Sequence, residues 1–153
     1  MWGNRWARAV SVRLCVTHVA GGEPLPTKCV LKVAGERRAW HREAYFGDLL
    51  KEETGVVRIH ESFAWMPRSA ASPLYCLISE QVEGGDLFQY LQRHPEPWPA
   101  AKARREIIRL LRAVTLPHST SAVHRDITPA NVFVTVGRVL KLGDFGIALA
   151  QRG

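Results

Sequence analysis

Two short polar motifs contain the residues whose chemistry stands out most. The first is His124-Arg125-Asp126-Ile127-Thr128-Pro129-Ala130-Asn131, and the second is Asp144-Phe145-Gly146. Carboxylate and amide oxygens are the donors that hard cations prefer, and a carboxylate can also accept a proton. Each motif by itself fits an ordinary turn or strand end. Their joint occurrence on the two sides of a pair of strand-like segments indicates a chemical site.

Further polar residues lie inside apolar segments upstream. Lys32 ends the strand-like run Cys29-Val30-Leu31-Lys32. Glu43 stands in the middle of the apolar face of an expected helix at 36–50, because Ala39, Glu43, Phe46 and Leu50 fall on one side at helical spacing. A carboxylate in the middle of an apolar helix face is the unusual feature of this segment.

Together these motifs resemble the catalytic core of eukaryotic-type serine/threonine protein kinases. That family has a His-Arg-Asp loop with a following Asn, an Asp-Phe-Gly beyond a hairpin, and a Val-Ala-Ile-Lys strand. The resemblance implies that Asp126 accepts or orients the proton of the substrate hydroxyl, with Arg125 in the same catalytic loop. It also implies that Asn131 and Asp144 bind Mg²⁺ against the phosphates of ATP.

The same resemblance implies roles for the upstream residues. Lys32 would hold the α- and β-phosphates, and Val30, on the same face of the strand, would lie against adenine. Glu43, in preference to Glu36, would form an ion pair with Lys32 that the helix makes or breaks as it moves. A local pair of Glu43 with His41 or an arginine is the alternative.

The segment 77–87 resembles the hinge between the two kinase lobes, followed by its glycine pair. On this alignment Ser79 is the gatekeeper residue, and Glu80 and Val82 offer backbone hydrogen bonds to adenine. Asp86 would reach the ribose, and it is also a plausible N-cap for a short helix. A hydrophobic strand with a turn is the alternative for the same residues, although it does not account for Glu80.

Periodicity predicts an α+β fold, and the resemblance implies that it is of protein-kinase type. Strands are expected at 10–17, 28–33, 56–63 and 74–82, helices at 36–50, 86–93 and 100–116, and a hairpin from 132–136 and 139–142. We therefore expect a small lobe and hinge at 1–82, with an antiparallel sheet and one helix. The beginning of a mainly helical large lobe would occupy 83–153.

Several features depart from the kinase pattern. Before Gly21 the only glycine is Gly3, so the glycine-rich loop is expected to be missing or a remnant. Thr128 stands where serine/threonine kinases carry a Lys, while Pro129 keeps the serine/threonine type of loop. The chain ends shortly after Gly146, so the sequence predicts a truncated domain that is inactive alone. Pro117 should end or kink the helix at 100–116 early.

Composition restricts the partners. The chain has 153 residues and a formal charge of +7, but its basic residues are dispersed, and the densest group, on the helix at 100–116, is interpreted as a solvated face. We expect a Ser- or Thr-containing protein substrate and no specific nucleic acid. Cys15, Cys29 and Cys76 are far apart, odd in number and without CxxC spacing, which indicates a reduced, cytoplasmic protein, and the apolar runs are too short to predict a membrane span.

Two rival functions remain. A small-molecule phosphotransferase of the aminoglycoside-kinase type shares the catalytic Asp, the Asn and the metal-binding Asp, but Arg125 and Gly146 argue against it. A pseudokinase or gene fragment that binds nucleotide without transferring phosphate is the other. The retained Lys32, Asp126 and Asp144 favour chemistry, whereas the missing segments favour the non-catalytic module.

Overall fold

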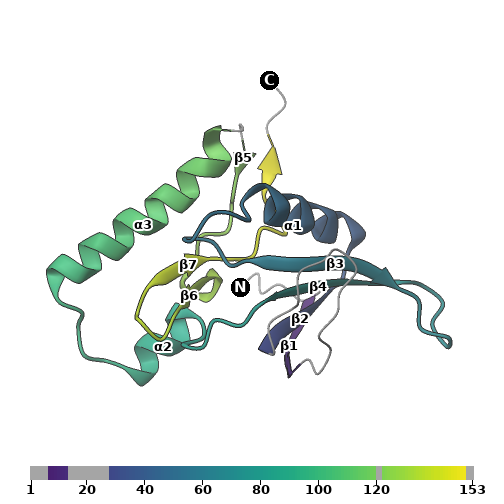
Figure 1. Cartoon of the computed structure of the whole chain (residues 1–153), viewed down its shortest axis with the longest axis horizontal. Coiled ribbons are helices and arrows are strands. Elements are labelled where there is room, and N and C mark those ends of the chain that lie inside the picture. The colour runs from purple at the N-terminus through teal and green to yellow at the C-terminus, as the bar shows by residue number, and fades with distance from the viewer. Residues whose placement is uncertain (1–6, 14–27, 120–121, 151–153) are drawn as a thin grey trace.

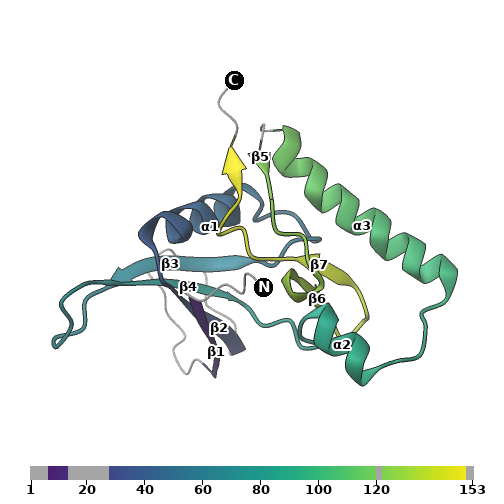
Figure 2. The same ribbon diagram turned by 180° about the vertical axis from the view of Figure 1, so that it is seen from behind.

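The computed structural model describes residues 7–13, 28–119 and 122–150 of the chain, with side chains at 28–115 and 123–148. Two regions lie side by side in both views of the ribbon (Figures 1 and 2). One is a sheet with a helix against it. The other is a long helix with a short helix and small hairpins. This arrangement is the α+β fold that the periodicity predicts.

The sheet is antiparallel and has the order β1-β2-β4-β3. Its strands are β1 (Ala7–Arg13), β2 (Lys28–Ala34), β3 (Ile59–Trp65) and β4 (Leu74–Glu80). Val30 pairs with Ser79 and Lys32 with Leu77, so Val30 and Lys32 project to the same face of β2. The register thus aligns the lysine strand with the strand that leads into the expected hinge.

Helix α1 (Arg37–Leu49) packs against β2, β3 and β4. Glu43 and Phe46 are buried on its inner face, as the helical spacing predicts. Gly47 is required there, because a Cβ at this position would lie 2.5 Å from Ile59 Cγ1. Trp40 adds a polar link, since its indole N–H donates to the carbonyl of Cys76 at 2.9 Å. Sheet and helix are therefore joined by packing and by this specific hydrogen bond, among others.

The second region begins with α2 (Leu87–Arg93) and α3 (Ala100–Ser119). Asp86 caps α2 as expected, with Oδ1 accepting from Gln89 N at 2.8 Å. The rest of the region consists of the following elements: β5 (Ala122–Val123), the 3₁₀ turn η1 (Pro129–Asn131), β6 (Val132–Val134), β7 (Leu140–Leu142) and β8 (Leu149–Ala150). The hairpin is present, but its loop is longer than the predicted Gly137-Arg138 turn: Thr135 N donates to the Val139 carbonyl at 2.9 Å, so three residues, 136–138, form the loop, with Arg138 at φ 56°.

One hydrophobic core joins the two regions. It contains buried residues of α1 and its C-terminal end, of α2 and α3, and of the β6–β7 hairpin with its continuation: Phe46, Leu50, Val56, Tyr90, Ala113, Val132, Val134, Leu140, Leu142, Phe145 and Ala148. Phe46 and Leu142 lie on opposite sides of the expected boundary at 82/83. That boundary stays a prediction, and the packing across it is continuous.

Two expectations about elements are wrong. The segment 56–63 is not a single strand: Val56 bridges to Leu142, and the Val57 N–H donates to the Leu142 carbonyl at 2.8 Å, so the segment's first residues pair with β7 and β3 begins at Ile59. Pro117 does not end its helix, since α3 continues to Ser119. A proline so near the helix end removes only one internal hydrogen bond, and packing of α3 on β5 and β7 outweighs that loss.

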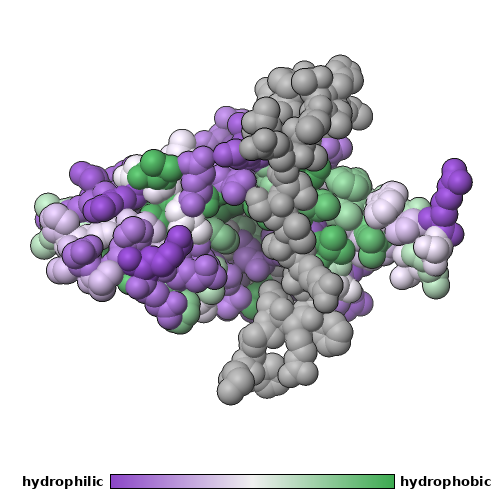
Figure 3. All heavy atoms as spheres, turned by 90° about the horizontal axis from the view of Figure 1, so that it is seen from below, coloured by the Kyte–Doolittle hydropathy of each residue, from purple (hydrophilic) through white to green (hydrophobic). Residues whose placement is uncertain are grey.

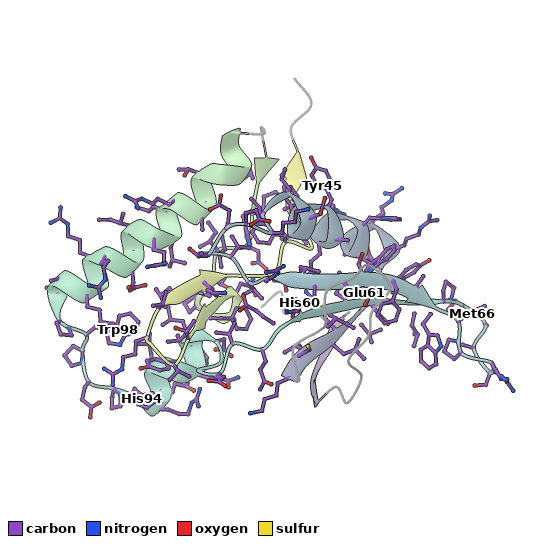
Figure 4. The ribbon with its side chains drawn as sticks, viewed as in Figure 1. Tyr45, His60, Glu61, Met66, His94 and Trp98 are labelled. Atoms are coloured by element: carbon purple, nitrogen blue, oxygen red, sulfur yellow. The ribbon has the colours of Figure 1, made fainter. Side chains whose placement is uncertain are left out.

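The surface carries several large apolar side chains. Tyr45 on α1 and Met66 in the β3–β4 connection are exposed (Figure 4). Ile107, Ile108 and Leu111 on α3 are exposed as well. Seen from below, the molecule is largely hydrophilic, with hydrophobic residues in separate patches (Figure 3). Among the described residues, no helix combines the length and the apolar character that crossing a membrane requires.

Candidate active site

Lys32 lies between two carboxylates. Its Nζ is 2.9 and 2.8 Å from the two oxygens of Glu43 and 3.0 Å from Oδ1 of Asp144. The exposed fractions of the Lys32 and Glu43 side chains are 16% and 7%. The predicted ion pair of Lys32 with Glu43 is therefore present. His41, the local alternative, is instead bonded to Arg37 at 3.2 Å.

The pKa values of this cluster follow from burial and charge. Burial alone would lower the pKa of Lys32, but the charges of Glu43 and Asp144 outweigh it and raise this pKa above its ordinary value. Burial raises the pKa of Glu43, and repulsion from Asp144 adds to this, while the ammonium of Lys32 opposes both. Lys32 is firmly cationic, and with both carboxylates ionised the cluster has one excess negative charge, which attracts a cation.

The His124–Asn131 loop is held together by its own side chains. Asn131 Nδ2 donates to the backbone oxygen of Asp126 at 2.9 Å and to its Oδ2 at 2.8 Å. The Gly143 N–H donates to the Asn131 carbonyl at 2.9 Å, which ties this loop to the Asp144 motif. Asp126, Asn131 and Asp144, far apart in the sequence, thus belong to one connected site.

Backbone strain coincides with this site. Arg125 and Asp144 have φ values of 69° and 60°, in the left-handed region that residues other than glycine seldom adopt. Such conformations cost about 1–3 kcal/mol each and persist where the surroundings impose them. Strain at two of the residues singled out by the sequence is a further indication that the geometry here is functional.

His124 and Phe145 connect the loop to α1. The Phe145 ring lies 4.5 Å from the His124 ring, edge to face, and 5.6 Å from the Phe46 ring, stacked. His124 Nε2 is 3.0 Å from the Gly143 carbonyl. Burial lowers the pKa of His124, against the opposing effects of this hydrogen bond and the charges of Asp144 and Asp126. A neutral imidazole therefore packs under the loop.

The expected hinge residues make contacts that the sequence did not reveal. One oxygen of the Glu80 side chain accepts from the Arg58 N–H at 2.7 Å and from Lys141 Nζ on β7. The Glu80 N–H donates to the Arg58 carbonyl at 2.9 Å, and the Val82 carbonyl accepts from Gly85 N at 3.0 Å. Glu80 is thus a link between the two regions. Asp86 acts as the helix cap, and its ribose role stays a prediction.

A cavity of about 230 Å³ adjoins the ion-pair cluster. It is lined by Lys32, Glu43 and Asp144 together with residues of the turn before α1, of α1 and of the segment at the Asp144 motif, among them Gly35, Arg42 and Ile147. Asp126 and the hinge residues do not line it. The structure therefore brings Lys32, Glu43 and Asp144 together at one cavity and links Asp126 and Asn131 to it through the backbone.

Three positioning residues escaped the sequence analysis. Trp40 ties α1 to β4, Lys141 pairs with Glu80, and Glu106 is a buried carboxylate of α3 whose Oε2 accepts from the Leu140 N–H at 3.1 Å. Glu106 could have been found, because it is an acid on the same helical face as Leu110 and Ala113. Nothing local in the sequence indicates the long-range partners of Trp40 and Lys141.

The comparisons with known proteins agree with this geometry. A model of the protein kinase domain matches residues 10–152. Cyclin-dependent kinase 4 of Ovis aries is 35% identical over 139 residues, which cover 90% of this chain and 42% of that protein. CBL-interacting protein kinase 4 of Oryza sativa subsp. japonica is 34% identical over 136 residues, covering 85% and 28%.

A second rice relative, CBL-interacting protein kinase 30, is 36% identical over 98 residues, which cover 64% of this chain and 19% of that protein. The chain spans less than half the length of these relatives. Most of the chain matches the family model, and the residues of the ion-pair cluster and of the two polar motifs lie within the match. The chain belongs to the protein kinase domain family.

Proposed function

We propose that this chain supplies the nucleotide-binding and catalytic-loop part of an ATP- and Mg²⁺-dependent serine/threonine protein kinase. The observation that carries the proposal is Lys32 held between Glu43 and Asp144, with Asp126 and Asn131 bonded into the same site. Lys32 is the cation for the α- and β-phosphates, and Glu43 fixes its position. The family match favours a protein kinase over a small-molecule phosphotransferase.

The residues present fit a magnesium ion. Asp144 offers a carboxylate, and Asn131 offers its amide oxygen, because its Nδ2 is already engaged by Asp126. Both are hard oxygen donors, and Mg²⁺ commonly takes one or two such ligands and keeps several waters. When bound, the ion would neutralise charge on the ATP phosphates. Asp144 and Asn131 are the residues that would hold it.

Adenine recognition is assigned to β2 and the hinge. Val30 lies on the Lys32 face of β2 and provides an apolar contact for the base. The Glu80 N–H and the Val82 carbonyl are already hydrogen-bonded. The Glu80 carbonyl and the Val82 N–H are therefore the acceptor and the donor that we propose for adenine.

Asp126 is the proposed base for the acceptor hydroxyl. A serine or threonine oxygen of a protein substrate forms a bond to the γ-phosphorus, the bond from that phosphorus to the bridging oxygen breaks, and ADP leaves. The hydroxyl proton passes to Asp126, whose orientation Asn131 maintains. Pro129 is typical of the serine/threonine type of loop. Thr128 stands at the position where that type usually has a Lys. We also propose that the protein is located in the cytoplasm.

Nucleotide binding is tested first, with the chain of 153 residues. Mg²⁺-ATP should raise its thermal transition, and Asp144→Asn should abolish the rise while Asp48→Asn, an exposed acid of α1, should leave it. Absence of any nucleotide effect, or an equal effect on the Asp144 variant, would overturn the proposal.

Phosphoryl transfer needs a second assay. We expect no peptide phosphorylation by this chain alone, and transfer only when the chain is joined to the remainder of a relative's kinase domain. In that chimaera Asp126→Asn should remove transfer but keep nucleotide binding. Binding without transfer in an otherwise folded chimaera would instead support the non-catalytic alternative, a pseudokinase module.

A further inference from the structure

A second cavity, of about 570 Å³, lies between α3 and the segment that follows α1. Both ribbon views show this segment approaching α3 (Figures 1 and 2). Arginines of α3 line one wall: Arg104, Arg105, Arg109 and Arg112. Glu53, Thr54 and Gly55 form the other wall. This arginine groove shares no lining residue with the cavity at Lys32.

The arginine groove has unbalanced charge. The part of α3 whose side chains are described has one acidic residue, Glu106. It has five basic residues: Lys102, Arg104, Arg105, Arg109 and Arg112. Glu106 is 1% exposed and lies 3.4 Å from the Nε atoms of Arg105 and Arg109. Within the part of the chain whose side chains are described, Arg104 and Arg112 have no ion-pair partner. The groove therefore has more cationic side chains than carboxylates that pair with them.

One guanidinium in the groove is incompletely satisfied. Arg109 Nε is buried, and among the described residues it has an ion pair with Glu106 but no hydrogen bond of acceptable geometry. Burying a guanidinium N–H without a hydrogen bond is costly. The Glu106 carboxylate, shared between Arg105 and Arg109, therefore does not fully satisfy the guanidinium groups around it.

Both walls are fixed before any ligand arrives. The Gly55 carbonyl accepts from Leu142 N at 2.8 Å, and the Glu53 carbonyl accepts from Val56 N at 3.2 Å. A Cβ on Gly55 would lie 3.4 Å from the Ala113 Cβ, so the loop already touches the helix at the base of the groove. A preorganised groove loses little entropy on binding.

The lining selects one kind of anion. The paired N–H groups of arginine match the oxygens of a phosphate, which carries about −1.5 to −2 charges on a phosphorylated side chain. Ala101, Ile108 and Ala113 add apolar contacts for neighbouring residues. Glu53 on the facing wall repels a continuous run of phosphates, which disfavours a nucleic acid. We propose that the arginine groove binds a phosphoserine- or phosphothreonine-containing peptide segment.

The probe is a labelled peptide of about six residues, alanine and glycine around one phosphoserine, which matches the ~18 Å from Ala101 to Ala113. Its binding to the full 153-residue chain is measured by fluorescence anisotropy at physiological ionic strength. Arg104→Gln/Arg112→Gln is the test variant, because it leaves the Glu106 contacts intact. Arg38→Gln/Arg68→Gln, two exposed arginines outside the groove, removes the same charge.

The test variant should weaken binding by about tenfold or more, and the matched control by about twofold at most. The thermal transitions of both variants show whether they remain folded, and Arg112→Gln alone serves if the double variant does not. Equal binding of the unphosphorylated peptide, equal losses in the two variants, or tighter binding of a single-stranded oligonucleotide to the same arginines would each overturn the proposal.

Discussion

The two cavities of the molecule handle charge in opposite ways. At Lys32 one buried cation is held by two carboxylates, whereas of the four arginines that line the groove two, Arg105 and Arg109, share one buried carboxylate, that of Glu106. In the first cluster two carboxylates depend on one cation, so the loss of Lys32 should lower the stability of the fold strongly. The arginine groove has more cations than ion-pair partners, so the loss of one arginine should change the stability of the fold little. Residue charge alone would not distinguish these sites, because burial and the number of partners decide what each charge does.

The largest effect is expected from Lys32→Met. This change leaves the buried Glu43 facing Asp144 without a cation, and breaking a buried pair in this way costs about 3–5 kcal/mol of unfolding free energy. Chemical denaturation measures the loss. Adding Glu43→Gln to Lys32→Met should restore part of the stability, because it removes the uncompensated charge.

The matched control is Lys51→Met, which breaks an exposed pair with Asp48. Exposed pairs contribute about 0–1 kcal/mol, so this variant should unfold nearly as the parent does. Equal losses in the Lys32 and Lys51 variants would show that the cluster at Lys32 is no more structural than a surface pair.

A smaller loss is expected from Glu106→Leu. This variant removes the acceptor of the Leu140 N–H and the only carboxylate beside Arg105 and Arg109, for an expected cost of about 1–3 kcal/mol. Glu106→Gln keeps an acceptor oxygen and should lose less. If the Leu variant is as stable as the parent, Glu106 does not anchor α3 to β7.

The contribution of His124 to stability should be visible in the pH dependence of unfolding. Because burial lowers its pKa in the folded chain below the ordinary 6.5, the stability linked to neutral His124 is complete above pH 6.5. It is lost as the pH falls through the lowered folded value. His124→Asn should therefore flatten the decline of the thermal transition between neutral and mildly acid pH, and His41→Asn, an exposed residue of α1, should not.

The smallest effect is expected from Arg112→Gln in the absence of ligand. Arg112 is exposed and has no ion-pair partner among the described residues, so its loss should change the unfolding free energy by no more than about 0.5 kcal/mol. Reduced repulsion along α3 could make the change favourable. A loss comparable to that of Lys32→Met would remove the contrast between the two cavities.

Much of the site could be predicted because its residues are marked by local patterns. Glu43 interrupts an apolar helix face, Lys32 ends a strand, and Asp126, Asn131 and Asp144 lie in recognisable motifs. The elements also follow local signals, as Asp86 shows by capping α2. Local patterns thus specify on which face of its helix or strand a residue lies and which chemical type of residue stands there.

Contacts set by tertiary packing could not be predicted. The pairing of Val56 and Val57 with β7 depends on a strand that lies far along the chain, and its sequence looks like an ordinary extension of β3. The continuation of α3 through Pro117 depends on packing against β5 and β7, which local propensity does not contain. The cavity that these arginines form with Gly55 could not be predicted either, because the segment 53–55 is not adjacent to α3 in sequence.

The hydrogen bond from Trp40 to the Cys76 carbonyl places a natural chromophore on the element that positions Glu43. An outward movement of α1 that separated Glu43 from Lys32 would also pull the indole from its acceptor on β4 and from the Tyr75 ring, 5.3 Å away. The emission of Trp40, obtained as the difference between the parent and a Trp40→Phe variant, would then shift to longer wavelength. The chain thus carries its own optical reporter of whether Lys32 is engaged by Glu43.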